Sequence, residues 1–173
     1  GFTTLLPYPS TIPIPENGEI IRGLISRFSN LPVHVYPMGA ASEHLHGKEM
    51  AGLYDMNQAG ARIFSDGVHS LSRAGTLLRI LRYLRSFSGI LMTGAITPEW
   101  AEVGQMHEGA VSTSLGLPGI PDIAEVISVE RDLNILRHVG GGDLHIGPLS
   151  VPKAVQIIDE ARKEGLTVSA SVQ

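Results

Sequence analysis

The chain has 173 residues, of which 43% are hydrophobic and 17% are charged, and its formal net charge is −4. This much apolar surface excludes an intrinsically disordered chain, and the absence of cysteine excludes disulfides, cysteine-ligated zinc and thiol nucleophiles. The acidic balance argues against nucleic acid as a partner, no apolar run approaches the roughly 18 residues of a membrane span, and no signal peptide is visible, so we expect a cytoplasmic protein.

Short apolar runs alternate with helical patterns along the chain, at a period of about 30 residues, the size of a βα unit. The predicted strands cover residues 1–8, 33–38, 61–65, 89–93, 143–149 and 166–172. The predicted helices cover residues 19–28, 48–59, 71–85, 121–138 and 151–164. In the third helix, leucines alternate with Arg79, Arg82 and Arg85, which we interpret as a solvated face. The long stretch 94–119 is predicted to be an irregular loop.

The apolar, non-alternating strands predict a parallel sheet covered by helices, and hence an α/β fold. Two architectures fit: an open doubly wound sheet, or part of a (β/α)8 TIM barrel. The first strand ends in Pro7-Tyr8-Pro9 without a glycine-rich phosphate turn, which disfavours a dinucleotide-binding sheet. A full barrel needs about 250 residues. If the barrel is correct, residues 1–173 form a single partial barrel domain of about six βα units.

In a barrel, chemistry lies at the C-terminal ends of the strands. Asp66 stands at such an end, after the strand 61–65 and before Gly67. Its carboxylate is either a metal ligand or a turn residue that bonds its own backbone, as Asp-Gly favours. His145 lies inside the strand 143–149, where the alternation of side chains points it into the barrel. It is either a metal ligand or a hydrogen-bonded core histidine.

The segment His44-Leu45-His46 has the H-x-H spacing of a metal-binding pair. On a strand this spacing puts both rings on one face, but here it lies in the polar loop 41–47, so we interpret it as a solvated loop. The sequence has no G-x-S-x-G or H-E-x-x-H motif. The residues alone therefore predict an α/β protein with one candidate metal carboxylate.

A set of short motifs runs in order along nearly the whole chain. The motifs include Gly1-Phe2-Thr3-Thr4, Pro9-Ser10-Thr11-Ile12-Pro13, Phe64-Ser65-Asp66-Gly67, Met106-His107-Glu108-Gly109, Ser114-Leu115-Gly116-Leu117-Pro118-Gly119 and Leu144-His145-Ile146. Their order and spacing resemble those of dihydroorotase, of the amidohydrolase superfamily. The resemblance implies an amidohydrolase (β/α)8 barrel. It also implies a hydrolase of pyrimidine biosynthesis that interconverts dihydroorotate and carbamoyl aspartate with a zinc-bound hydroxide.

The resemblance also assigns metal ligands by position. Asp66 matches the middle-strand carboxylate, but the two later histidine ligands fall at Gly94 and Pro148, whose side chains cannot ligate a metal. The first H-x-H strand would lie before Gly1, and the final aspartate would lie beyond Gln173. The resemblance therefore implies that zinc is absent or weakly bound.

The remaining implied roles are few. Asp66 and His145 are the candidate metal ligands, Ser10 replaces the asparagine that usually binds substrate, and no residue is assigned as catalytic. Two functions stay open. One is a catalytically impaired dihydroorotase acting on a small-molecule substrate. The other is a non-catalytic subunit that scaffolds aspartate carbamoyltransferase or a homo-oligomer, as some dihydroorotase-like chains do.

Overall fold

The computed structural model describes residues 1–101 and 103–172. Its centre is a five-stranded parallel sheet with the strand order β3-β4-β5-β8-β9. These strands span Gly39–Ala40, Ile63–Ser65, Ile90–Thr93, Asp143–Leu149 and Val168–Val172. The spatial order follows the chain order, without the reversal that marks a doubly wound sheet. The sheet is therefore wound as part of a (β/α)8 barrel, and the doubly wound alternative is wrong.

The region of the predicted strand 33–38 holds two short strands that pair with different neighbours, one inside the predicted range and one just after it. β2 (His34–Val35) pairs in parallel with β1 (Thr4–Leu5), whereas β3 pairs with β4. Pro37 lies between β2 and β3 and has no N–H to donate to a ladder. The prediction ended this strand at Met38, but the residues that join the main sheet come just after it. Each of the six predicted strands thus contains a strand of the structure, but in the second region the strand of the main sheet, β3, lies beyond the predicted bounds.

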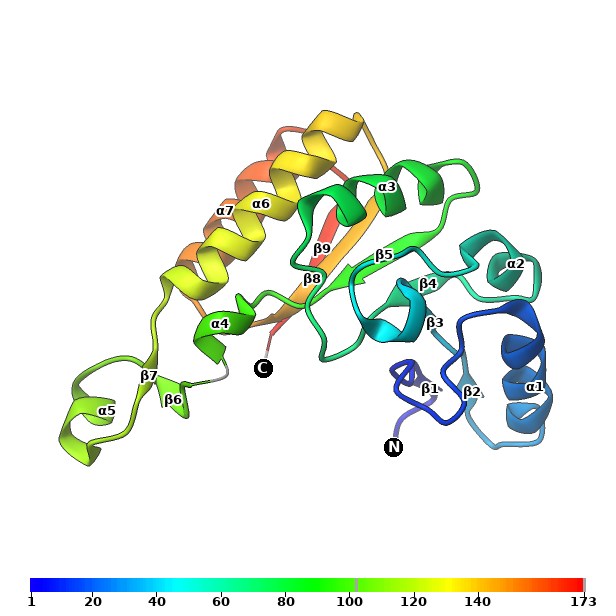
Figure 1. Cartoon of the computed structure of the whole chain (residues 1–173), viewed down its shortest axis with the longest axis horizontal. Coiled ribbons are helices and arrows are strands. Elements are labelled where there is room, and N and C mark those ends of the chain that lie inside the picture. Colours follow the sequence, from blue (N-terminus) through cyan, green and yellow to red (C-terminus); the bar gives the residue numbers. More distant parts are fainter. Residues whose placement is uncertain (102, 173) are drawn as a thin grey trace.

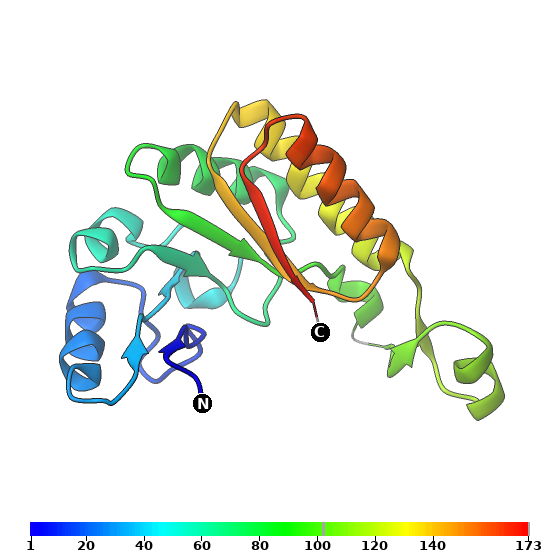
Figure 2. The ribbon, with the colours of Figure 1, turned by 180° about the vertical axis from the view of Figure 1, so that it is seen from behind.

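Helices α3 (Ala74–Arg85), α6 (Ile123–Val139) and α7 (Pro152–Lys163) cover one face of the sheet, as Figures 1 and 2 show. The core lies between these helices and the strands. Its fully buried side chains include Leu77, Leu81, Leu84, Leu91, Leu133, Leu136, Leu144 and Phe64. Helices α1 (Gly18–Phe28) and α2 (Leu53–Gln58) contact each other beside β3. One-sided helical cover is what barrel winding requires.

Two predicted helices begin three or more residues later than their patterns indicated. The segment before α2 is extended, because Ser42 and Met50 form an isolated antiparallel β-bridge. Next to it, the Ala51 N–H donates to the Ala41 carbonyl at 3.2 Å. The helix predicted from residue 48 therefore begins at Leu53. The helix predicted from residue 71 begins at Ala74, although the preceding Leu71 is still buried.

The stretch 94–119, which was predicted to be irregular, contains short helices and strands over about half of its length. It contains α4 (Pro98–Ala101), β6 (Met106–His107) and α5 (Ala110–Leu115), and β7 (Gly119–Ile120) closes it by pairing in parallel with β6. Figures 1 and 2 show β6, α5 and β7 as an arm that projects away from the sheet. The expectation of an irregular loop was wrong, because two-residue strands carry no readable periodicity.

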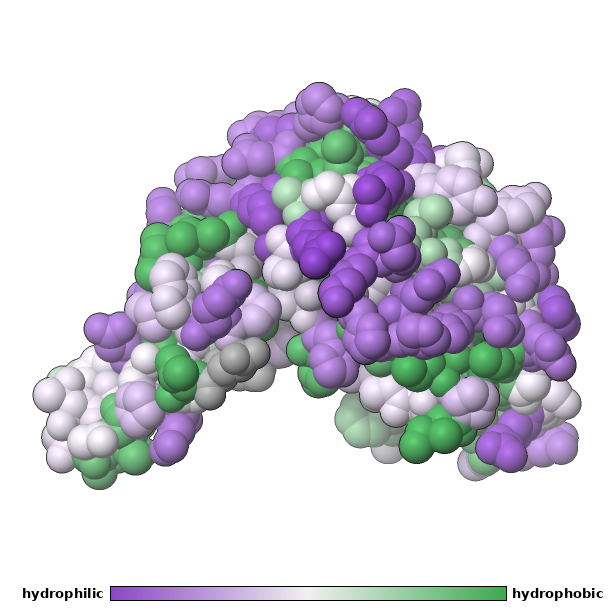
Figure 3. Space-filling model, viewed as in Figure 1, coloured by the Kyte–Doolittle hydropathy of each residue, from purple (hydrophilic) through white to green (hydrophobic). Residues whose placement is uncertain are grey.

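The outer surface of α3 carries the arginine stripe. Arg79, Arg82 and Arg85 are exposed, opposite the buried leucines of the same helix, and hydrophilic side chains follow the rim over α3 and α6 in Figure 3. Arg85 also donates to the carbonyl of Val139 at 2.9 Å, at the end of α6. Among the helices that the structure describes, none is long and apolar enough to cross a membrane.

Candidate functional site at the strand ends

The parallel register brings three predicted site positions together at the C-terminal ends of the strands, which we call the C-terminal edge of the sheet. β4 pairs with β5, and β5 pairs with β8, so the residues just past these strands are neighbours. Asp66 follows β4, Gly94 follows β5, and Pro148 lies near the end of β8. This edge is where a barrel fold carries its chemistry.

Asp66 is buried, with 1% of its surface exposed, and its carboxylate faces the segment that follows β3. Its Oδ1 accepts hydrogen bonds from the backbone N–H groups of Ala41 at 3.1 Å and Ser42 at 2.9 Å. Its Oδ2 accepts a hydrogen bond from the Ser42 hydroxyl. The same hydroxyl accepts from the Gly47 N–H at 2.7 Å. Both carboxylate oxygens therefore hold the loop after β3.

The surroundings of Asp66 act on its charge in opposite directions. Burial raises the pKa of this carboxyl, while the hydrogen bonds from Ser42 and Ala41 and the nearby His69 ring oppose the rise. The Asp-Gly turn expected here is present, but the Asp66 side chain does not bond its backbone. The Gly67 N–H donates instead to the Ser65 hydroxyl at 3.0 Å. Asp66 thus anchors a distant loop instead of its own turn.

His145 lies on the sheet face opposite the helices. Its neighbours Leu144 and Ile146 are buried in the core, so the alternation of the strand places the imidazole on the other side. Its Nδ1 lies 2.9 Å from the Ser169 hydroxyl and its Nε2 lies 3.3 Å from the Ser171 hydroxyl. Burial lowers the pKa of His145. The ring is therefore half-buried, with a serine hydroxyl within hydrogen-bond distance of each of its nitrogens.

Ser10, the candidate substrate-binding residue, lies on an exposed part of the first loop. Its neighbour Pro9 is buried and, with Tyr8, packs near Gly67, where an added Cβ would lie 3.7 Å from the Pro9 Cδ. The fold thus brings the segment that carries Ser10 to the strand end that carries Asp66.

The two histidines of the H-x-H segment are exposed, in a connection that contains a short helical turn. Glu43–Leu45 forms the short helix η1, and the rings of His44 and His46 meet edge to face with centroids 5.8 Å apart. The His44 Nδ1 lies 3.3 Å from the Glu16 Oε2, with both side chains partly or largely exposed. Among the residues that the structure describes, no three His, Asp or Glu side chains are placed to hold a metal ion.

The donor set at the strand ends decides whether zinc fits. Zinc sites use three or four protein ligands, supplied by cysteine, histidine or carboxylate side chains. Gly94 has no side chain, Pro148 has no donor atom in its ring, and the Asp66 oxygens already accept three hydrogen bonds. The described residues of this chain do not fit a zinc centre.

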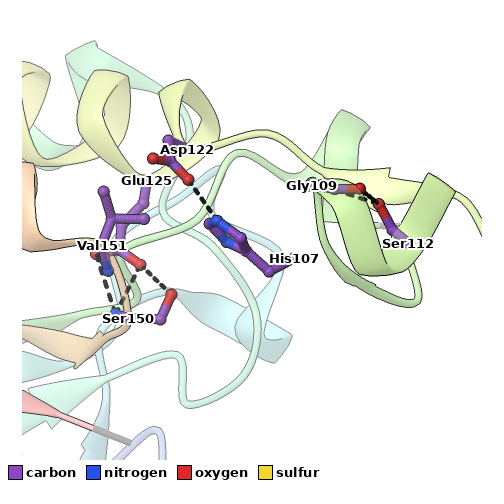
Figure 4. A network of polar contacts seen from close by, with 7 residues as sticks. All are labelled: His107, Gly109, Ser112, Asp122, Glu125, Ser150 and Val151. Atoms are coloured by element: carbon purple, nitrogen blue, oxygen red, sulfur yellow. Dashed lines mark hydrogen bonds and ion pairs between the residues drawn. The ribbon is translucent and has the colours of Figure 1, made fainter. Parts of the chain in front are cut away.

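Glu125 holds the C-terminal end of β8 and was not assigned a role from sequence. The residue is 7% exposed, and its carboxylate accepts hydrogen bonds from the Ser150 N–H at 2.9 and 3.2 Å, the Ser150 hydroxyl at 2.8 Å and the Val151 N–H at 2.9 Å (Figure 4). The sequence signal was an acidic residue in the first turn of α6. Figure 4 also shows His107 of β6 beside Asp122 at 3.0 Å, at the base of the arm.

The amino-acid sequence was compared with those of known proteins. No protein-family model matches the chain. The chain is 37% identical to the dihydroorotase of Syntrophus aciditrophicus (strain SB) over 171 residues, which cover 98% of this chain and 40% of that protein. It is also 37% identical to the dihydroorotase of Pelotomaculum thermopropionicum, covering 99% of this chain and 40% of that protein. The chain thus spans about 40% of the length of the curated relatives it matches.

Solved structures show the same fold at lower identity. The D-hydantoinase from Bacillus sp. AR9 matches with a TM-score of 0.64 at 16% identity, over 98% of this chain and 39% of that chain. The dihydropyrimidinase from Brevibacillus agri NCHU1002 matches with a TM-score of 0.63 at 13% identity, over 98% of this chain and 38% of that chain. Over nearly its whole length the chain is therefore a homologue of the dihydroorotases, and it has the fold of part of an amidohydrolase-type barrel.

Proposed function

We propose that the protein containing this chain is a dihydroorotase homologue that has lost zinc-dependent hydrolysis and acts as a structural subunit. The observation that carries the proposal is the donor set at the strand ends. Gly94 and Pro148 stand at the two positions where the resemblance expects histidine, and the Asp66 carboxylate is occupied by Ala41 and Ser42. The described residues of this edge lack two of the imidazole ligands with which zinc would activate water.

The proposed partner is an aspartate carbamoyltransferase or a second copy of the protein. The support is the resemblance to dihydroorotase-like chains of that structural kind. In this role the outer surface of the barrel contacts the partner. Assembly would not require the metal ligands at the strand ends.

A second candidate function is hydrolysis of a cyclic amide, with dihydroorotate and carbamoyl aspartate as the substrate pair. Its support is the similarity to proteins named dihydroorotase at 37% identity. The greater part of each relative's length lies outside the match, so this activity belongs to the whole protein. In that case ligands from elsewhere in the protein would have to compensate for Gly94 and Pro148.

One measurement on the full-length protein separates the two candidates. The purified protein is analysed for zinc by mass spectrometry and assayed for dihydroorotate hydrolysis with and without added zinc, with the Syntrophus aciditrophicus dihydroorotase as the positive control. We expect less than a tenth of an equivalent of zinc and no hydrolysis above background. Hydrolysis that requires zinc and disappears in Asp66→Asn would overturn the loss of chemistry and establish the second candidate.

The structural role has its own test. Sedimentation velocity of the full-length protein, alone and mixed with the aspartate carbamoyltransferase of the same organism, reports assembly directly. We expect a stable oligomer or a complex with the transferase. A protein that stays monomeric in both samples would end the scaffold proposal, whatever the outcome of the hydrolysis assay.

A further inference from the structure

The outer surface of α3 carries positive charge that acidic side chains do not balance. Residues 67–98 contain four arginines and no Asp, Glu or Lys, although acidic residues outnumber basic ones by 17 to 13 in the whole chain. Three of these arginines, Arg79, Arg82 and Arg85, are exposed along α3. The ion pairs among the described residues include none of the three. The helix therefore presents uncompensated positive charge on its outer side, where Figure 3 shows strongly hydrophilic side chains.

The three guanidinium groups are held in place, but by acceptors other than carboxylates. The contacts are those of Arg79 with the Lys48 carbonyl at 3.4 Å, Arg82 with the His138 Nε2 at 3.2 Å and Arg85 with the Val139 carbonyl at 2.9 Å. A guanidinium group has five N–H donors, so each of the three keeps donors for a further acceptor. Because the side chains are already ordered, the entropic cost of binding that acceptor is lowered.

An aromatic cluster borders the arginines. Tyr83 follows Arg79 by one helical turn, and its ring meets that of Phe87 edge to face with centroids 5.6 Å apart. The ring of Tyr54, in α2, meets Phe87 at 5.7 Å. Phe87 in turn contacts the fully buried Phe64 at 6.2 Å, which anchors the cluster in the core. Tyr83 and Tyr54 are 40% and 50% exposed. We define the Arg79–Tyr83 face as the surface formed by Tyr54, Arg79, Arg82, Tyr83, Arg85 and Phe87.

The composition of the Arg79–Tyr83 face is that of a protein-binding surface. Tyrosine and arginine are enriched in interfaces and in their energetic hot spots, whereas lysine and glutamate are depleted. The charge of the face decides the charge of the partner, because interfaces pair a positive patch with a negative one. Nucleic acid fits less well, since its binding is driven by many contacts of lysine and arginine with phosphate, and this chain has a net charge of −4.

We propose that the Arg79–Tyr83 face binds an acidic segment of a partner protein that also carries apolar side chains. The carboxylates of the segment accept paired hydrogen bonds from the guanidinium groups, a geometry that arginine matches and lysine does not. Its apolar side chains pack on the exposed rings of Tyr54 and Tyr83. The face includes none of the residues at the strand ends, so this inference is independent of zinc content and of hydrolysis.

The test uses the full-length protein and a fluorescein-labelled peptide of Glu-Glu-Leu repeats, with Gln-Gln-Leu repeats as the neutral counterpart. Binding is followed by fluorescence anisotropy. We expect the acidic peptide to bind at least tenfold more tightly than the neutral one, and more weakly at raised salt. The double substitution R79Q/R82Q should weaken its binding at least tenfold. Arg85 is left in place, because its hydrogen bond to the Val139 carbonyl also holds the end of α6.

Matched controls separate this face from net charge and from exposed aromatic rings in general. R22Q/R27Q removes two exposed arginines from α1 and changes the net charge by the same amount, so it should leave the affinity unchanged. Tyr83→Ala should weaken binding at least threefold, whereas Tyr36→Ala, at an exposed tyrosine after β2, should have no effect.

Three results would overturn the proposal: no binding of the acidic peptide, equal binding of the two peptides, or an equal loss of binding in R22Q/R27Q and R79Q/R82Q. A labelled oligouridylate and vesicles that contain phosphatidylserine are titrated in parallel. If either binds more tightly than the acidic peptide and loses its binding in R79Q/R82Q, the face recognises nucleic acid or membrane and the proposal is rejected.

Discussion

Asp66 and Ser42 are joined twice across two neighbouring strands. The Ser42 N–H donates to the Asp66 Oδ1 at 2.9 Å, and the Ser42 hydroxyl donates to the Oδ2 of the same carboxylate. Both residues are buried, at 1% and 0% exposure. The carboxylate that the resemblance matches to a metal ligand is thus the anchor of a backbone loop in this chain.

This anchor predicts the effect of removing it. Asp66→Ala leaves the buried N–H and hydroxyl of Ser42 without their acceptor, whereas the Ala41 N–H keeps the Ser65 carbonyl at 3.1 Å. Each such loss costs about 1–3 kcal/mol. We expect the free energy of unfolding of the full-length protein, measured in urea, to fall by about 3 kcal/mol. Ser42→Ala should cost about 1–2 kcal/mol, and the double variant less than the sum because the two residues share one interaction.

The control for this prediction is Glu49→Ala, which removes an exposed carboxylate from the same loop. Its effect should stay within about 0.5 kcal/mol, as for most surface substitutions. Strict additivity of Asp66→Ala and Ser42→Ala would show that the two side chains do not act together.

Glu125 predicts a second stability effect at the end of β8. Glu125→Ala removes the acceptor of the Ser150 and Val151 N–H groups, and hydrogen bonds to charged groups contribute about 1.5–3 kcal/mol each. We expect a loss of about 3 kcal/mol in urea unfolding, together with faster hydrogen exchange at residues 149–152. Glu130→Ala, at an exposed position of the same helix, should change neither quantity. Unchanged hydrogen exchange at residues 149–152 in Glu125→Ala would show that Glu125 does not hold the end of β8.

The strand and helix pattern could be predicted because it is local. The buried Leu144 and Ile146 on either side of His145, and the leucines at helical spacing in α3, each report the period of their own element. The winding of the sheet needed the structure, since periodicity is the same in an open sheet and a barrel. The chain order of β3, β4, β5, β8 and β9 decided it.

The candidate site could be predicted only in part, for a physical reason. The strand pattern gave the position of Asp66 and the resemblance gave those of Gly94 and Pro148, and the three lie close together because parallel strands align their ends. The partners of Asp66 lie 24 and 25 residues earlier in the chain, and nothing near Asp66 in the sequence says which loop its carboxylate reaches. Glu125 was missed for the same reason, as its partner Ser150 lies 25 residues later.

His145 predicts a pH dependence of stability. Burial lowers its pKa below the ordinary value of 6.5 in the folded state, so the unfolded chain takes up this proton first as the pH falls. The contribution of His145 to stability is therefore complete above pH 6.5 and is lost as the pH falls through the folded-state pKa. We expect His145→Gln to flatten this part of the stability profile between pH 7 and pH 5. The ring titration of His145, followed by NMR, should have its midpoint below 6.5, and a midpoint at or above 6.5 would reject the prediction.

Restoring imidazoles at the strand ends tests the account of the lost zinc site. No atom lies within 4 Å of a Cβ added at Gly94, and Pro148 is exposed, so the double substitution G94H/P148H has room on the folded structure. Two added imidazoles bring the donor set toward the three or four ligands of a zinc site. We therefore expect zinc affinity at least tenfold above that of the parent protein, measured by competition with a chelating dye. Adding S42A frees one Asp66 oxygen and should raise the affinity further, while S42A alone should not. Equal affinities in parent and double variant would mean that Gly94 and Pro148 do not explain the missing metal chemistry.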